Sequence, residues 1–188
     1  MNDGPAIRPE DPRDHAEVRR LHALAFGDPR RVPDLVDDLR AGPAALSLVA
    51  TAGNGEVVGH VMLSACRLDA PARLVDVLGL SPLGVHPDHQ RRGVGTRLLR
   101  AALHAAGELG TPLVFLEGSP AYYGPRGFER ADGLGFRSPS LRIPAAAFQV
   151  ARLDAYRPWM TGTFVYPDAF WAHDCVGLRE PDATRVPD

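Results

Sequence analysis

The stretch from Val85 to Thr96 constrains the fold of this chain more than any other part of the sequence. It carries two arginines and two glycines between an apolar, strand-like run and an amphipathic helix. The first amides of a helix are free of helical hydrogen bonds, and the helix dipole favours negative charge there. Glycine lets a backbone approach a ligand closely, and arginine donates to phosphate oxygens. The stretch therefore predicts a pyrophosphate site on a strand–turn–helix unit.

The segment after this turn predicts a helix followed by a buried strand. The apolar residues at helical spacing are Val94, Leu98, Ala102, Ala105 and Leu109. Residues 113–116 form a continuous apolar run, which is typical of a strand buried on both faces. A strand, helix and strand in this order make a right-handed crossover between parallel strands. Ligands of such sheets bind beyond the carboxyl ends of the strands, here beyond Val85 and Glu117.

The N-terminal half predicts an edge strand, two helices and three antiparallel strands. The edge strand covers residues 6–10, and the helices run from residue 13 to Gly27 and over residues 31–40. The first helix is expected to place Val18, Leu21, Leu24 and Ala25 on one apolar side. The three strands cover residues 45–50, 56–67 and the stretch from residue 74 to Val85, with a hairpin turn at Asn54-Gly55. Pro82 predicts a bulge in the third strand.

The C-terminal third is less regular. Strands are expected over residues 135–143, 147–153 and 161–166, after a short helix or turn that follows Glu117. Aromatic residues gather near the end, and they predict core closure, an acceptor-pocket wall or a dimer surface. The members of this aromatic cluster are Trp159, Met160, Phe164, Tyr166, Phe170 and Trp171. We expect one domain over residues 1–178 and a polar, frayed tail over residues 179–188.

Composition narrows the class of protein. The length of 188 residues suits one domain, and no run of about 20 apolar residues predicts a transmembrane helix. The N-terminus has neither the basic nor the apolar region of a signal peptide. Cys66 and Cys175 lie far apart, which favours reduced thiols and a cytoplasmic location. The net charge of −2 is scattered, so neither a nucleic-acid partner nor a membrane partner is expected.

Three matched motifs resemble a known family. The first reads Val85-His86-Pro87 followed by Gln90-Arg91-Arg92-Gly93-Val94-Gly95, the second is Tyr122-Tyr123 followed by Gly127-Phe128, and the third is the opening Ile7-Arg8-Pro9. In their order along the chain, with the opening first, these motifs resemble the GCN5-related N-acetyltransferase (GNAT) superfamily, and the Pro-Ala-Tyr-Tyr loop is similar to that of its YhbS-like group. The resemblance covers about residues 6 to 170. It implies an α/β (α+β) fold with a mixed, twisted and splayed central sheet flanked by helices on both faces.

The resemblance also implies a binding site for acetyl-coenzyme A as co-substrate. The cleft should lie between the strand ending at Val85 and the strand ending at Glu117, with pyrophosphate on the amides of residues 91–96. The pantetheine arm should pair like an added strand with the backbone of residues 83–85. Ser119 and Tyr122 should line the thiol channel. The implied cofactor-binding residues are Leu83, Gly84, Val85, Gln90, Arg91, Arg92, Gly93, Val94, Gly95, Thr96, Ser119, Tyr122 and Arg126.

The chemistry of acetyl transfer assigns expected roles to three groups. The developing oxyanion needs a donor, and the family implies the amide of Val85. The leaving thiolate gains from a proton, and Tyr123 matches the family's general acid. Glu117 is the first choice for a general base because it stands at the mouth of the second strand. Ser81, through a water, and His86 are the other candidates, and an exposed amine can lose its proton to bulk water without any base.

Several functional alternatives stay open at this point. A non-catalytic acyl-CoA-binding or regulatory module and a nucleotide-binding protein both use the same turn. The acceptor is a small molecule or a peptide amine; the choices include an antibiotic, a peptide N-terminus and a lysine side chain, and O-acylation or a longer acyl group fits as well. The segment around residues 26–31 and the late strands should form the acceptor wall. The run from His86 to His89 shows no third ligand, so no metal is expected. Neither cysteine is placed near the thiol site, which favours direct transfer in a ternary complex.

Overall fold

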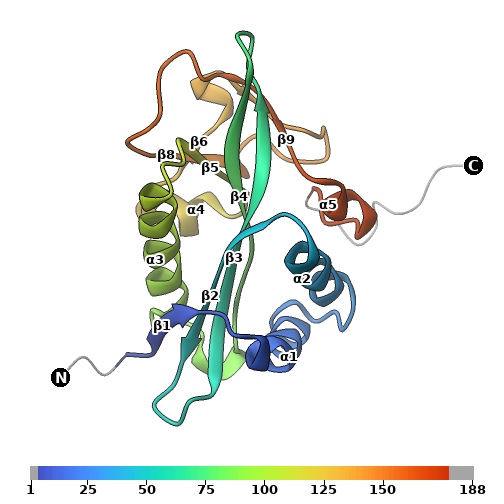
Figure 1. Cartoon of the computed structure of the whole chain (residues 1–188), viewed down its shortest axis with the longest axis vertical. Coiled ribbons are helices and arrows are strands. Elements are labelled where there is room, and N and C mark those ends of the chain that lie inside the picture. The colour runs from blue at the N-terminus through green and yellow to red at the C-terminus, as the bar shows by residue number, and fades with distance from the viewer. Residues whose placement is uncertain (1–3, 178–188) are drawn as a thin grey trace, which may run out of the picture.

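The computed structural model describes residues 4–177, in which a nine-stranded mixed sheet carries helices on both faces (Figure 1). The strands are β1 (Ala6–Pro9), β2 (Ala44–Thr51), β3 (Val57–Asp69), β4 (Leu74–Val85), β5 (Leu113–Glu117), β6 (Glu129–Arg130), β7 (Phe136–Arg137), β8 (Phe148–Arg152) and β9 (Gly162–Val165). The α-helices are α1 (His15–Phe26), α2 (Arg31–Ala41), α3 (Val94–Glu108), α4 (Pro120–Tyr123) and α5 (Asp168–Ala172). The 3-10 turns are η1 (Pro12–Asp14), η2 (Pro87–His89), η3 (Gly124–Arg126) and η4 (Asp132–Leu134).

The sheet parts at its centre. The main strand order is β1-β2-β3-β4-β5-β8-β6, and β9 pairs with both β3 and β7. Strands β1 to β4 are antiparallel neighbours, whereas β4 and β5 are parallel and pair only at Leu78 with Val114 and Gly79 with Phe115. The register of β3 against β4 shifts between Leu80 and Leu83, which confirms the bulge predicted at Pro82. Beyond that bulge, the end of β4 has no β5 partner, so its outer edge is open.

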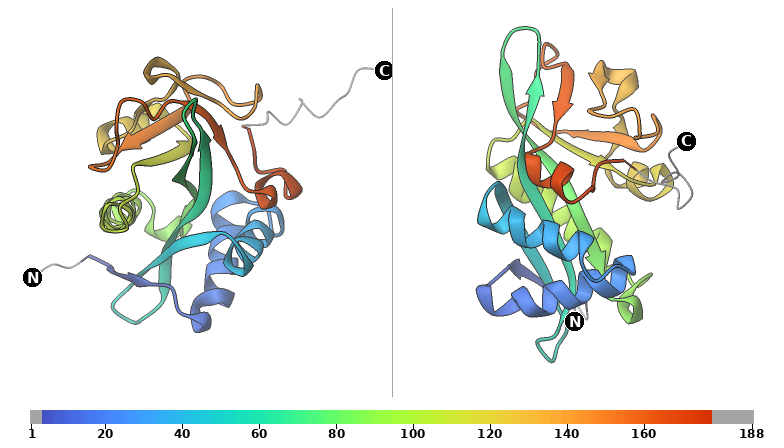
Figure 2. Two further views of the ribbon diagram at one scale, coloured as in Figure 1. Left: turned by 45° about the horizontal axis from the view of Figure 1, so that its top comes forward. Right: turned by 90° about the vertical axis from the view of Figure 1, so that its right-hand side faces the viewer.

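Helices cover the two faces of the sheet unequally (Figure 2). Helix α3 covers most of one face, where Leu98, Leu99 and Ala102 are fully buried and Tyr123 of α4 packs against the same cluster. Helices α1, α2 and α5 cover the other face, where their apolar side chains belong to one buried cluster that also includes Phe115 and Phe164 of the sheet. Apolar burial on both faces is the main stabilising term of such a fold. The mixed sheet with helices on both faces confirms the predicted fold class.

A buried polar chain fixes α1 against the sheet. Arg40 donates to Glu10 Oε2 at 3.1 Å, and Ser47 donates to the same oxygen at 2.6 Å. Because the Ser47 hydroxyl is used in this way, His60 Nε2 donates to it at 2.8 Å, and His60 Nδ1 accepts from His22 Nε2 at 2.7 Å. Burial lowers the pKa of both imidazoles, so they are neutral. Burial alone would raise the pKa of Glu10, but the His60 ring, whose Nε2 lies 3.7 Å from Oε2, and the hydrogen bonds from Arg40 and Ser47 hold this pKa far below its usual value.

The structure corrects three expectations about local structure. Leu24 and Leu109 are 55% and 61% exposed, and α1 buries His22 in the polar chain instead. Most of residues 135–143 is turn, because Gly135 has a positive φ and the Ser138 hydroxyl bonds the carbonyl of Ser140. The tail expected at residues 179–188 lies outside the described residues. Within residues 4–177 no helix is long and apolar enough to cross a membrane.

Candidate active site

A first pocket lies between the end of β4, the start of α3 and the α4–η3 loop. Its volume is about 400 Å³, and we call it the turn pocket. Residues that the resemblance assigned to cofactor binding supply most of its wall. The lining residues are Leu83, Val85, His89, Gln90, Arg91, Gly93, Val94, Gly95, Thr96, Tyr122, Tyr123 and Arg126. Segments that are about 40 residues apart in sequence thus form one wall.

Free amides line the base of the turn pocket. The first helical hydrogen bond into α3 runs from the amide of Arg97 to the carbonyl of Gly93. The six amides of residues 91–96 donate to no other residue of the described chain. The backbone reaches this geometry through positive φ angles of 58° at Arg91 and 83° at Gly93. A turn with six free N–H groups and the positive end of a helix dipole is suited to an anion such as pyrophosphate.

The open edge of β4 supplies a second set of backbone groups. The amide of His86 donates to the carbonyl of Val58 on β3. The backbone N–H and C=O groups of successive residues in a strand point to opposite edges of that strand. Those of Gly84 therefore also face β3, whereas those of Leu83 and Val85 face the gap between β4 and β5. The side-chain amide of Gln90 donates to the Val85 carbonyl at 3.1 Å. The Val85 N–H, in contrast, is directed at the gap and has no such partner among the described residues. Of residues 83–85, which were expected to pair with the pantetheine arm, only Leu83 and Val85 have backbone groups that face the gap.

Tyr122 and Arg126 close the pocket over the helix. The Tyr122 hydroxyl lies so near the Cα of Gly95 that any side chain at residue 95 would collide with it. Arg126 stacks on the Tyr122 ring at 4.0 Å and donates to Thr96 Oγ1 at 2.9 Å and to the Tyr122 carbonyl. These contacts tie the α4–η3 loop to the first turn of α3.

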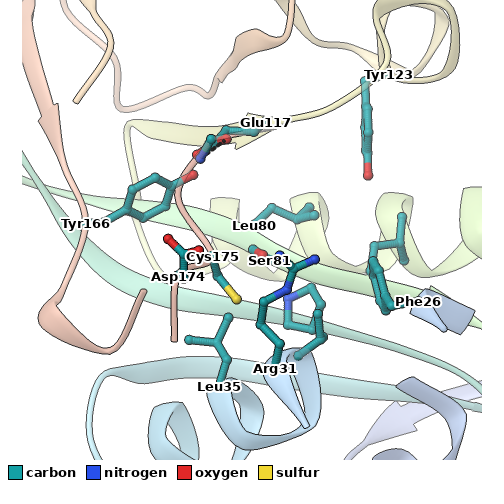
Figure 3. Close-up of a pocket in the computed structure, with 14 residues that line it drawn as sticks. Phe26, Arg31, Leu35, Leu80, Ser81, Glu117, Tyr123, Tyr166, Asp174 and Cys175 are labelled. Atoms are coloured by element: carbon teal, nitrogen blue, oxygen red, sulfur yellow. Dashed lines mark hydrogen bonds between the residues drawn. The ribbon is translucent and has the colours of Figure 1, made fainter. Parts of the chain in front are cut away.

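A second pocket, the gap pocket, lies between β4, β5 and the N-terminus of α2 (Figure 3). Its volume is about 330 Å³, and it combines apolar, acidic and basic side chains. The lining residues are Phe26, Arg31, Val32, Leu35, Leu80, Ser81, Pro82, Leu83, Glu117, Tyr123, Tyr166, Asp174, Cys175 and Gly177. The turn pocket and the gap pocket share two residues, Leu83 and Tyr123.

Tyr123 stands where the two pockets meet. Its side chain extends from the end of α4 into the gap pocket (Figure 3). The ring packs against Gly118 and meets the edges of Tyr122 and Phe128. Burial raises the pKa of the Tyr123 phenol to about 12, with a smaller contribution from Tyr122. The phenol therefore keeps its proton throughout the physiological pH range and is able to donate it.

Glu117 ends β5 inside the gap pocket. Its Oε2 accepts a hydrogen bond from the amide of Gly177 at 2.9 Å. Its Oε1 is buried and receives no hydrogen bond of ordinary geometry from the described residues, although the Tyr166 phenol points towards the carboxyl (Figure 3). Burial raises the pKa of Glu117, and the Gly177 amide and Tyr166 offset this only in part. A raised pKa makes this carboxylate a stronger base than an exposed one.

Replacing Glu117 with glutamine should stabilise the fold at neutral pH. Because folding raises the pKa of Glu117 above its usual 4.5, the folded state binds this proton more tightly than the unfolded chain does. The wild type therefore loses stability as pH rises through 4.5 and then through the folded-state value. We expect the melting temperature of Glu117→Gln to exceed that of the wild type at pH 8 and to match it below pH 4. A difference of the opposite sign at pH 8 would contradict the assigned burial.

The remaining expected site residues fall into two groups. Ser81 lines the gap pocket, as a water-holding role requires. Arg92 and His86 line neither of the two pockets. Arg92 lines a neighbouring hollow, and the His86 ring accepts a hydrogen bond from the backbone amide of Asp88. Ser119 is exposed and also outside them, and its carbonyl accepts the amides of both tyrosines of α4. Among residues 4–177 no group of three or more His, Cys, Asp or Glu side chains could hold a metal ion.

Cys175 corrects an expectation. The sequence predicts that neither cysteine lies near the thiol site, but Cys175 lines the gap pocket. Its thiol donates a hydrogen bond to the carbonyl of His173 at 3.4 Å. Burial raises the pKa of this thiol to about 11, so at neutral pH it is not a thiolate nucleophile. Cys66 is buried in β3 away from both pockets.

Other gap-pocket residues carry no motif. The wall expected from residues 26–31 is present as Phe26 and Arg31. No residue of the late strands lines the gap pocket; the C-terminal part of its wall comes from Tyr166, just after β9, and from Asp174, Cys175 and Gly177. The backbone of Asp174 has a positive φ of 54°, which is uncommon for a residue other than glycine, and Gly177 follows with a φ of 91°. In the aromatic cluster, Phe164 and Phe170 are fully buried, as core closure requires.

A family comparison agrees with this geometry. The sequence model of the Acetyltransferase (GNAT) domain matches residues 6–131, which is more than half of the chain. The chain therefore belongs to the GNAT N-acetyltransferase family and is an enzyme of that class. The matched region includes β4, the turn, α3, β5 and both tyrosines of α4.

Particular relatives extend the match to most of the chain. The sequence is 33% identical to the uncharacterized N-acetyltransferase YhbS of Escherichia coli over 168 residues, which is 87% of this chain and 97% of YhbS. The crystal structure of E. coli YhbS in complex with CoA aligns with a TM-score of 0.82 at 31% identity, covering 90% of this chain and 93% of that chain. A GNAT acetyltransferase from Brucella melitensis in complex with acetyl-CoA aligns with a TM-score of 0.72 at 29% identity, covering 90% and 99%.

Proposed function

We propose that this protein transfers an acetyl group from acetyl-CoA to a primary amine, by direct attack of the amine in a ternary complex. The observation that carries the proposal is the meeting of the turn pocket and the gap pocket at Leu83 and Tyr123. A thioester delivered through one pocket and an amine held in the other would meet beside the Tyr123 phenol. The CoA and acetyl-CoA complexes of the two structural relatives support the donor side.

The residues of the turn pocket fit coenzyme A. The free amides of residues 91–96 and the guanidinium of Arg91 would hold the pyrophosphate. The outward backbone groups of Leu83 and Val85 would pair with the amide groups of the pantetheine arm. Tyr122 and Arg126 would close the site over the first turn of α3.

Three groups of this chain would perform the chemistry. Glu117 would take the proton of the ammonium, directly or through a water, so that the nitrogen can attack the thioester carbonyl. The amide of Val85 would donate to the oxyanion that develops on that carbonyl. As the carbon–sulfur bond breaks, Tyr123 would give its proton to the leaving thiolate, and the resulting phenolate would take the second proton that the acylated nitrogen loses, so that the products are the amide and the free thiol. The same burial that raises the pKa of Tyr123 also raises the basicity of a thiolate beside it, so the proton transfer stays close to balanced.

The proposal is tested by binding and by turnover. CoA should bind in calorimetry and should not be displaced by ATP at equal concentration. Thiol release from acetyl-CoA should then rise above the hydrolytic background with at least one member of a panel of amines. Displacement of CoA by ATP would support a nucleotide-binding protein instead. Tight CoA binding without thiol release for any amine in the panel would support a non-catalytic acyl-CoA-binding module.

A further inference from the structure

The gap pocket presents opposite charges on facing walls. Glu117 reaches into it from β5, and Asp174 lines it from the loop after α5. Arg31 enters from the opposite side, from the first residue of α2, and its guanidinium points into the pocket between these walls (Figure 3). A ligand with one charge of each sign would therefore find a partner on each side.

The Arg31 guanidinium has donors to offer a ligand. Asp28 is its nearest carboxylate partner, but Oδ2 of Asp28 is 3.9 Å from Arg31 Nε, and Oδ1 of Asp28 accepts the backbone amides of Arg30 and Arg31. The terminal nitrogens of Arg31 make no ion pair within 4.0 Å in the part of the chain that the structure describes. Asp174, in contrast, is held by Arg142 at 3.7 Å. An arginine with a free fork is suited to bidentate binding of a carboxylate.

An apolar surface separates the two charged walls. Val32 and Leu35 face the pocket from α2, Leu80 faces it from β4, and Phe26 closes it at the end of α1. The volume of about 330 Å³ is at the small end of the range for ligand pockets, and it favours a small molecule over a protein segment. The pocket thus combines a base, an apolar surface and an anion-binding group.

From these features we infer that the acceptor is a small zwitterion, in which one apolar skeleton carries both the amine and a carboxylate, as in a free aliphatic or aromatic amino acid. The amine faces Glu117, the apolar side chain lies on Leu35 and Leu80, and Arg31 binds the carboxylate. This inference rests on the proposed acetyl transfer. It makes Arg31 the residue that determines acceptor specificity.

The test compares matched acceptors in a thiol-release assay with acetyl-CoA. Leucine is paired with 3-methylbutylamine, and phenylalanine with 2-phenylethylamine, so that each pair differs by the carboxylate. Because the carboxylate also changes the basicity of the nitrogen, the informative quantity is the change that a substitution makes to each kcat/KM. We expect Arg31→Gln to lower kcat/KM about tenfold for the amino acids and less than about twofold for the simple amines. Arg31→Lys should retain part of the preference, because it keeps the charge and loses the fork.

Arg30 provides the matched control. It precedes Arg31 and is exposed as Arg31 is, but it does not line the pocket, so Arg30→Gln removes the same charge without removing the proposed contact. Equal losses in Arg30→Gln and Arg31→Gln, or equal losses for amino acids and simple amines, would overturn this inference while acetyl transfer stands. Wild-type preference for the simple amines would overturn it as well. Failure of every amine despite CoA binding would instead remove the proposed function, and this inference with it.

Discussion

Replacing Tyr123 with phenylalanine is expected to lower kcat at least about 100-fold, the usual effect of removing a general acid. The substitution removes one oxygen and keeps the ring that packs on Gly118 and Phe128, so the pocket should keep its shape. The phenol is protonated at neutral pH because burial raises its pKa to about 12. The affinity for CoA should change by less than about twofold, since the pyrophosphate and pantetheine contacts assigned to the turn pocket do not use this hydroxyl.

The control for this variant is Tyr156→Phe. Tyr156 is half-buried beside Arg152 and lines neither pocket, so losing its hydroxyl should leave kcat unchanged. Single-turnover kinetics and CoA titrations on both variants separate chemistry from binding. If Tyr123→Phe raised KM for acetyl-CoA and left kcat intact, Tyr123 would be a binding residue and would not be the acid.

Replacing Gly95 with leucine is expected to weaken CoA binding about 100-fold. A Cβ at residue 95 already collides with the Tyr122 hydroxyl, and the rest of a leucine side chain would fill the turn pocket. An overpacking cost of about 3 kcal/mol corresponds to about two powers of ten in affinity. The fold should survive, because the colliding atom is the far end of a tyrosine side chain, and the helix gains a better helix former than glycine.

Gly107 offers a matched control in the same helix. A Cβ at residue 107 meets nothing within 4 Å, so Gly107→Leu should bind CoA as the wild type does and should be no less stable. Calorimetric CoA titrations and thermal melts of both variants measure the two quantities. Normal CoA affinity in Gly95→Leu would show that the cofactor does not use the first turn of α3.

Local sequence rules predicted the backbone around the turn pocket well. The spacing of Gly93 and Gly95 after an apolar strand requires a helix start with free amides, and Pro82 requires a break in the ladder. Both features depend on residues within a few positions of each other, and the structure confirms the helix start and the bulge. The parallel crossover from β4 to β5 followed from chain order alone.

Most of the gap pocket could not be predicted, because its residues meet only through tertiary packing. Cys175 and Asp174 follow a short helix with no motif, and they reach Glu117 across about 60 residues of sequence. Periodicity also placed Leu109 on the apolar side of α3, but the helix ends at Glu108 and leaves that side chain in solvent. On α1 the buried face includes His22 where apolar side chains were expected, because only the folded chain shows that His60 Nδ1 lies within reach to accept a hydrogen bond from His22 Nε2.

The gap pocket and the turn pocket share only two lining residues, Leu83 and Tyr123, and this has a consequence for how enzymes of this design diverge. Substitutions on α2 or in the loop after α5 would alter the pocket proposed for the amine and would leave the pocket proposed for coenzyme A unchanged. Under the proposed mechanism, a few changes near Arg31 would therefore give new acceptor preferences without loss of acetyl transfer.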